Sequence, residues 1–185
     1  MNIGLLGFGV VGGGVWELAQ ENRALNVKKV LVRREAPPLG KAAVQDVEAI
    51  LRDTDIDTVV EVLGGLHPAY EWICRALAAG KDVVTANKAV ISAYYRELTA
   101  LAHENGAALR CTAAVGGGIP WLVNLQRCRR VDTVTEVGGI MNGTTNFMLT
   151  KMVRENLGFD DALKIAQELG YAETKDPGDD VDGRD

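Results

Sequence analysis

The chain has 185 residues and a formal net charge of −5, with 20 Lys and Arg residues against 25 Asp and Glu residues. This acidic balance argues against a cationic nucleic-acid-binding protein. Hydrophobic residues make up 47% and charged residues 24% of the chain, a composition typical of a globular protein rather than of a disordered chain. The length allows one full domain, or one domain and part of a second.

The cysteines and the apolar stretches argue against export. Cys74, Cys111 and Cys128 are an odd number of cysteines without the spacing of a metal site, which favours a reducing compartment. The uncharged stretch 3–16 follows no Lys or Arg, unlike a signal peptide. No uncharged run reaches the roughly 18 residues that a membrane span requires. We therefore expect a cytoplasmic protein.

Strands and helices are predicted to alternate over the first 114 residues. The predicted strands cover 2–6, 27–32, 58–62, 82–85 and 107–114. The predicted helices include one after the first strand and others over 46–52, 68–79 and 92–104, with Ser92 as the cap of the last. Strands that are apolar on both faces and alternate with helices indicate an α/β fold with a doubly wound parallel sheet.

The pattern changes after the three glycines at 116–118. Helices are predicted over 120–128, 144–155 and 159–169, and a longer strand over 131–141. An acidic tail that contains Pro and Gly follows. The chain is therefore predicted to hold one domain over 1–130 and the beginning of an α+β domain over 131–185.

Gly7, Gly9 and Gly12 form a GxGxxG motif between the first strand and the first helix. In a dinucleotide-binding domain the first glycine permits the tight turn, the second lets the pyrophosphate approach the backbone, and the third lets the helix pack on the strand. The amides of Val10 and Val11 then face the phosphates at the helix N-terminus. The alternative is a glycine-rich turn with a structural role only. Gly64, in the turn after the third strand, is a further candidate contact to the cofactor.

The residues after the second strand bear on the choice of cofactor. NAD-binding domains usually carry Asp or Glu there, whereas this chain has Arg33 and Arg34. Arginine side chains match the geometry of a 2′-phosphate, so the sequence favours NADP over NAD. The alternative is that both arginines are a solvated strand end.

Lys88 follows the strand 82–85 and is predicted to lie at the carboxyl edge of the sheet, where open α/β sheets bind ligands. A lysine there can donate a proton to the oxygen of a carbonyl group that is being reduced, and it also lies within reach of the cofactor. The alternative is an ordinary surface lysine.

Three later segments are candidates for substrate contact, each with a structural alternative. The glycine cluster that contains Gly117 could contact a ligand or act as a hinge. Asn142 and Thr144 lie in a short polar stretch that could bind a small polar substrate as well as cap a helix. The six carboxylates of 173–185 are either solvated or arranged around an ammonium group.

Four motifs together resemble homoserine dehydrogenase. They are Gly-Leu-Leu-Gly-Phe-Gly-Val-Val-Gly at 4–12, Thr-Ala-Asn-Lys at 85–88, Ala-Val-Gly-Gly-Gly-Ile-Pro at 114–120 and Gly-Ile-Met-Asn-Gly-Thr-Thr-Asn-Phe at 139–147. The resemblance implies a Rossmann-type NAD(P)-binding domain followed by a substrate and dimerisation domain, through which the protein forms a homodimer. It also implies NAD(P)-dependent interconversion of L-aspartate 4-semialdehyde and L-homoserine.

The resemblance also implies roles for individual residues. Lys88 and Asp185 match catalytic positions, and Glu173 and Asp180 match positions that bind the substrate's amino group. Thr112 stands where members that bind a monovalent cation often have Glu, a departure that argues against such an ion. The backbone carbonyls of Val115 and Gly117 are the remaining candidate ligands for it.

Two alternatives to this function remain open on the sequence. The family has a second active-site lysine about one helical turn beyond the position that matches Asp185, and the sequence ends before it. One alternative is therefore a truncated NAD(P)-binding or assembly module without turnover. The other is a different amino-acid dehydrogenase, such as one that acts on aspartate.

Overall fold

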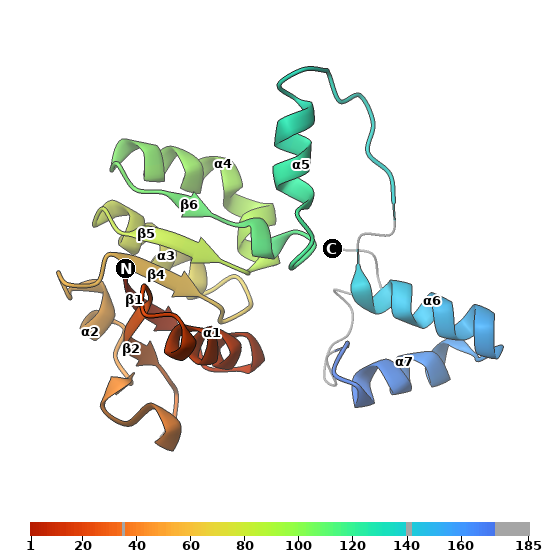
Figure 1. Ribbon diagram of the computed structural model, residues 1–185, viewed down its shortest axis with the longest axis horizontal. Coiled ribbons are helices and arrows are strands. Elements are labelled where there is room, and N and C mark those ends of the chain that lie inside the picture. The colour runs from red at the N-terminus through yellow and green to blue at the C-terminus, as the bar shows by residue number, and fades with distance from the viewer. Residues whose placement is uncertain (35, 140–141, 173–185) are drawn as a thin grey trace. The chain divides into compact units, whose positions relative to one another are not determined.

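The computed structural model describes residues 1–34, 36–139 and 142–172 (Figure 1). The chain divides into two compact units, Met1–Gly118 and Ile119–Asp185, which are described separately below. The division lies at the glycine cluster, and the predicted boundary near residue 130 falls inside the second unit. None of the described helices is both long and apolar enough to cross a membrane.

The first unit contains a six-stranded parallel sheet with the order β3-β2-β1-β4-β5-β6. Its strands are β1 (Asn2–Leu6), β2 (Asn26–Leu31), β3 (Ala43–Val44), β4 (Thr58–Glu61), β5 (Asp82–Thr85) and β6 (Leu109–Arg110). The chain proceeds outward from β1 to β3 and then returns to the other side of β1 with β4. Ligands of doubly wound sheets bind at this reversal, beside the carboxyl ends of the strands. The predicted α/β fold is confirmed.

Helices cover both faces of this sheet (Figure 1). They are α1 (Val10–Glu21), α2 (Glu48–Leu51), α3 (Ala69–Ala78) and α4 (Lys88–Glu104), with short 3₁₀ helices at Pro37–Ala42 and Thr112–Ala114. Leu5 and Leu6 are neighbours in β1 and point to opposite faces, so they join different core clusters. Leu5 packs in the cluster that contains Ala19 of α1, and Leu6 packs in the cluster that contains Ile73 of α3.

Two predicted elements of this unit differ most from the structure. The helix predicted from Ser92 begins at Lys88, because Asn87 caps it: the Asn87 side chain accepts a hydrogen bond from the Val90 amide. The strand predicted over 107–114 is limited to Leu109–Arg110 and is followed by the 3₁₀ turn Thr112–Ala114. The first of these differences changes where Lys88 lies, since it becomes the first residue of a helix.

The second unit contains α5 (Trp121–Cys128), α6 (Gly143–Glu155) and α7 (Phe159–Glu168). Met148 of α6 packs against Ala162 and Ala166 of α7 in a small core. The strand predicted over 131–141 is wrong for the described residues 131–139, which form no strand. The described part of this unit has no strand to pair with them, and an extended segment needs a hydrogen-bonded neighbour to become a strand.

Candidate functional site

Each glycine of the turn between β1 and α1 has different surroundings at the position of its missing side chain. Gly7 has φ +107°, a left-handed conformation, and a Cβ there would lie 3.1 Å from the Val62 carbonyl oxygen. A Cβ at Gly12 would lie only 2.3 Å from the Gly7 carbonyl oxygen. A Cβ at Gly9 would meet nothing within 4 Å. The space beside Gly9 is therefore open to a ligand, which fits the place of a pyrophosphate in a dinucleotide site.

The N-terminus of α1 is also suited to an anion. Gly9 is the N-cap residue and provides no side-chain cap, and the first turn contains no acidic residue. Val10 is 96% exposed and Val11 is also exposed, so their surroundings are accessible. Uncapped amides at a helix N-terminus favour a phosphate through hydrogen bonding and the helix dipole.

Arg33 and Arg34 lie just beyond β2, at the same edge of the sheet as the glycine turn. The Gly7 amide donates a hydrogen bond to the Leu31 carbonyl oxygen at 3.3 Å, which ties the turn to the end of β2. Both arginine side chains are exposed, and neither forms an ion pair within the described part of the chain. Two guanidinium groups are thus available for an anionic group near the turn.

Lys88 lies at the carboxyl end of β5, where it begins α4, and its side chain is exposed. The preceding residue, Asn87, is buried, with an exposed fraction of 5%. Asn87 Nδ2 donates a hydrogen bond to the Gly65 carbonyl oxygen at 2.7 Å. This bond joins the start of α4 to the Gly64–Gly65 turn after β4, where both glycines have positive φ.

The structure therefore brings the cofactor-site candidates and Lys88 to one edge of the sheet. Leu6 pairs with Glu61, and Glu61 pairs with Thr85, so β1, β4 and β5 end side by side. The glycine turn, the Gly64 turn and Lys88 follow these three strand ends directly.

Glu61 is a residue of this edge that the sequence prediction missed. Its side chain is fully buried, and its two oxygens accept hydrogen bonds from the Leu63 amide after β4 and from the Thr85 hydroxyl at the end of β5. The available signal was a carboxylate at the end of an apolar strand, directly before a turn with two glycines. Such a residue in a buried strand requires partners, and they come from Leu63 on its own chain segment and from Thr85, three residues before Lys88.

The remaining candidates belong to other segments. Val115 and Gly117 lie in the turn that ends the first unit, and Gly117 has φ +57° with nothing within 4 Å of its Cβ position. Asn142 caps α6 through its Oδ1, which accepts from the Thr145 amide at 2.8 Å. The Thr144 hydroxyl donates to the Tyr171 carbonyl oxygen at 2.6 Å and so links α6 to the end of α7. Glu173, Asp180 and Asp185 lie outside the described residues.

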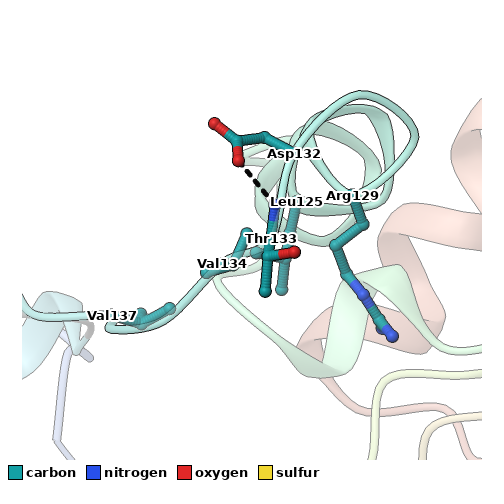
Figure 2. Close-up of a pocket in the computed structure, with 6 residues that line it drawn as sticks. All are labelled: Leu125, Arg129, Asp132, Thr133, Val134 and Val137. Atoms are coloured by element: carbon teal, nitrogen blue, oxygen red, sulfur yellow. Dashed lines mark hydrogen bonds between the residues drawn. The ribbon is translucent and has the colours of Figure 1, made fainter.

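The described residues contain no group of three or more His, Cys, Asp and Glu side chains that could hold a metal ion. A pocket of about 460 Å³ lies in the second unit, apart from the residues predicted from the sequence (Figure 2). Its lining comes from the end of α5 and the segment that follows, and the Asp132 carboxylate in it accepts a hydrogen bond from the Thr133 amide. The pocket contains none of the residues predicted from the sequence. Its lining residues are Leu125, Arg129, Asp132, Thr133, Val134 and Val137.

Comparison with protein families matches both units of the chain. Residues 7–112 match the NAD-binding domain of homoserine dehydrogenase, and residues 120–185 match a second model described as homoserine dehydrogenase. The chain belongs to the homoserine dehydrogenase family. The matches favour this family over a different amino-acid dehydrogenase, and the first one identifies the glycine-turn unit as the family's nucleotide-binding domain.

Individual members of the homoserine dehydrogenase family agree with this assignment. The chain is 43% identical to a homoserine dehydrogenase of Synechocystis and 40% identical to one of Bacillus subtilis, each over the whole chain. It covers 45% and 46% of those two proteins, so it spans about half the length of the curated relatives that it matches.

Solved structures of the homoserine dehydrogenase family have the same fold. A homoserine dehydrogenase from Thiobacillus denitrificans superposes with a TM-score of 0.88 at 37% identity over 98% of this chain and 45% of that one. A hyperthermophilic archaeal homoserine dehydrogenase in complex with NADPH superposes with a TM-score of 0.80 at 29% identity, over 99% of this chain and 65% of that one.

Proposed function

We propose that the protein to which this chain belongs catalyses the NAD(P)-dependent interconversion of L-aspartate 4-semialdehyde and L-homoserine. The observation that carries the proposal is the arrangement at one sheet edge. The open glycine turn follows β1, and Lys88 follows β5 at the start of α4. A hydrogen bond from Asn87 holds the start of α4 to the Gly64–Gly65 turn, which follows β4. A dinucleotide-binding turn and a proton donor therefore lie at the same edge of the sheet.

The residues of the first unit have distinct tasks in this proposal. The nicotinamide cofactor, when bound, supplies or accepts the hydride. The space beside Gly9 and the amides of Val10 and Val11 receive the pyrophosphate. Arg33 and Arg34 bind a 2′-phosphate, which makes NADP the preferred cofactor. Gly64 borders the cofactor from the β4 turn.

Lys88 performs the proton transfer. Its ammonium group donates a hydrogen bond to the aldehyde oxygen and a proton to that oxygen as it becomes the hydroxyl of homoserine. In the reverse direction the amine accepts the hydroxyl proton. A cation at this position also stabilises the negative charge that develops on the oxygen during reduction.

The substrate-binding part of the proposal rests on the family resemblance. It assigns substrate contact to Gly117, Asn142, Thr144, Glu173 and Asp180, and a catalytic role to Asp185. The carbonyls of Val115 and Gly117 would hold a monovalent cation. We further propose that domain 1–130 binds the cofactor, that the domain from 131 onward forms a homodimer, and that the protein is cytoplasmic.

The test is homoserine-dependent reduction of NADP⁺, followed at 340 nm with the protein expressed from its complete gene. We expect turnover with L-homoserine and little with L-aspartate, which serves as the matched control substrate. Equal or greater activity with aspartate, or no activity with homoserine, would contradict the proposal.

A further inference from the structure

We propose that Glu61 is a positioning residue, whose buried carboxylate fixes both the Gly64–Gly65 turn and the start of the helix that carries Lys88. This inference rests on the proposed function only for its catalytic consequence. The structural part concerns the nucleotide-binding unit itself.

The carboxylate is placed at the centre of the edge that holds the site. Glu61 is the last residue of β4, between β1 and β5, and its side chain has no exposed surface. Leu6 and Thr85 are its paired neighbours in these two strands. A charged side chain in such a position is unfavourable unless hydrogen bonds replace the water that it loses.

The two oxygens of Glu61 accept hydrogen bonds from the turn that follows β4 and from the last residue of β5. Oε1 accepts from the Leu63 amide at 2.8 Å, in the segment that leads directly into Gly64. Oε2 accepts from the Thr85 hydroxyl at 2.6 Å. Asn87 Nδ2 makes a longer contact to Oε1 at 3.4 Å. Every buried polar side-chain atom of the described chain has a partner, so this network is complete.

Thr85 and Asn87 extend the network to Lys88. The Thr85 hydroxyl donates to Glu61 and accepts from the Asn87 amide at 3.0 Å. Asn87 in turn donates to the Gly65 carbonyl oxygen and accepts from the Val90 amide in the first turn of α4. The Glu61 carboxylate thus contacts Asn87 both directly and through Thr85. Because Asn87 directly precedes Lys88, the position and direction of the backbone at Lys88 depend on this carboxylate. Small displacements of a catalytic group reduce turnover strongly.

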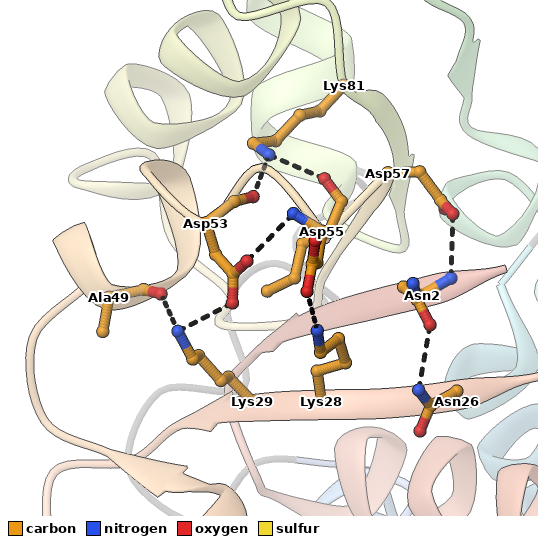
Figure 3. A network of polar contacts seen from close by, with 10 residues as sticks. Asn2, Asn26, Lys28, Lys29, Ala49, Asp53, Asp55, Asp57 and Lys81 are labelled. Atoms are coloured by element: carbon orange, nitrogen blue, oxygen red, sulfur yellow. Dashed lines mark hydrogen bonds and ion pairs between the residues drawn. The ribbon is translucent and has the colours of Figure 1, made fainter.

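The test compares two isosteric variants with a matched buried control. Glu61→Gln keeps the shape of the side chain but places an amide N–H group where an oxygen accepts from Leu63 or Thr85. Thr85→Val removes the hydroxyl that bridges Glu61 and Asn87, and Thr85→Ser restores it. The control is Lys81→Met, at the opposite end of β5. Lys81 is also buried, and its Nζ donates to the carbonyl oxygens of Asp53 and Ile56 (Figure 3).

We expect Glu61→Gln and Thr85→Val to lower kcat for homoserine about tenfold or more and to raise the Kd for NADPH about threefold. Thr85→Ser should recover most of the loss. Lys81→Met should lower the melting temperature but leave kcat and the Kd for NADPH within about twofold of wild type. Binding of NADPH is measured by its fluorescence, and kcat with the protein expressed from its complete gene.

The outcomes separate this inference from the proposed function. Wild-type values of kcat and Kd in Glu61→Gln and Thr85→Val, or losses no larger than those of Lys81→Met, would overturn the positioning role alone. A wild-type protein that binds NADPH without acting on homoserine would overturn the proposed function, and the Kd comparison would still decide the structural part. A wild-type protein that binds neither NADPH nor NADH would overturn both.

Discussion

The carbonyl oxygen of Gly7 lies 2.3 Å from the position that a Cβ atom at residue 12 would occupy. The contact is between the end of the first strand and the first helix, and a backbone atom has no rotamer with which to move away. Gly12→Ala is therefore expected to destabilise the fold by about 1–3 kcal/mol. Gly14→Ala is the matched control in the same helix, since a Cβ there meets nothing within 4 Å. It should stabilise the fold by about 0.5–1 kcal/mol. Urea unfolding of both variants measures the difference, and equal stabilities would show that the strand and helix can separate without cost.

Gly9→Ala should affect binding rather than folding. Gly9 has φ −88°, which any residue can adopt, and its Cβ position is open. The added methyl group would instead occupy space that we assign to the pyrophosphate. We expect an unchanged unfolding midpoint and a rise of about tenfold or more in the Kd for NADPH, measured by fluorescence titration. Unchanged affinity would place the pyrophosphate elsewhere.

Much of the first unit could be predicted from the sequence because its signals are local. The glycine motif, the apolar strands and Gly80 at the end of α3, with φ +71°, each depend on neighbouring residues. The sequence predicted Ser92 as the cap of α4, whereas the helix is capped by Asn87, which has an equally suitable side chain. The choice follows from Gly65, 22 residues earlier, whose carbonyl oxygen holds the Asn87 side chain in place.

The parts that could not be predicted depend on distant partners. The role of Glu61 could not be predicted, because two donors to its carboxylate oxygens, Thr85 and Asn87, are 24 and 26 residues away in the sequence. The strand expected over 131–141 has the composition of a strand, but a strand forms only where another one pairs with it. The composition of a segment does not show whether another strand lies beside it.

Arg33→Asp tests the proposed preference for NADP. The exposed guanidinium near the glycine turn would bind a 2′-phosphate, whereas a carboxylate would repel it and accept hydrogen bonds from ribose hydroxyls. We expect the ratio of Kd values for NAD⁺ and NADP⁺ to shift toward NAD⁺ by about tenfold or more, which corresponds to one charge-assisted hydrogen bond. Calorimetry with both cofactors measures the ratio, and Arg34→Asp shows which arginine contributes more. If neither variant shifts the ratio, both arginines are a solvated strand end.

The stability of the fold in acid should depend on Asp57. The Asn2 backbone amide donates to its carboxylate at 2.9 Å, and this bond, followed by the Thr58 hydroxyl, holds the pKa of Asp57 below its ordinary value (Figure 3). A lowered pKa in the folded state stabilises the fold above the unfolded-state pKa of about 3.9, and the contribution disappears as the pH falls through the folded-state pKa. Melting temperatures from about pH 6 down to pH 2.5 should therefore fall less steeply for Asp57→Asn than for wild type. Parallel curves would contradict the assignment.

Lys88→Ala tests the proton transfer. Loss of the amine that accepts the hydroxyl proton is expected to lower kcat for homoserine oxidation by roughly 10²-fold or more, while the Kd for NADPH changes little, because the phosphates are bound at the glycine turn. Lys28→Ala is the control, since Lys28 lies on a strand of the same sheet and forms only a surface ion pair with Asp55 at 2.7 Å. Its kcat should match that of wild type. An active Lys88→Ala enzyme would assign the proton to another group. Equal losses in kcat and in NADPH affinity would instead make Lys88 a binding residue, since a proton donor acts on the substrate oxygen and not on the cofactor.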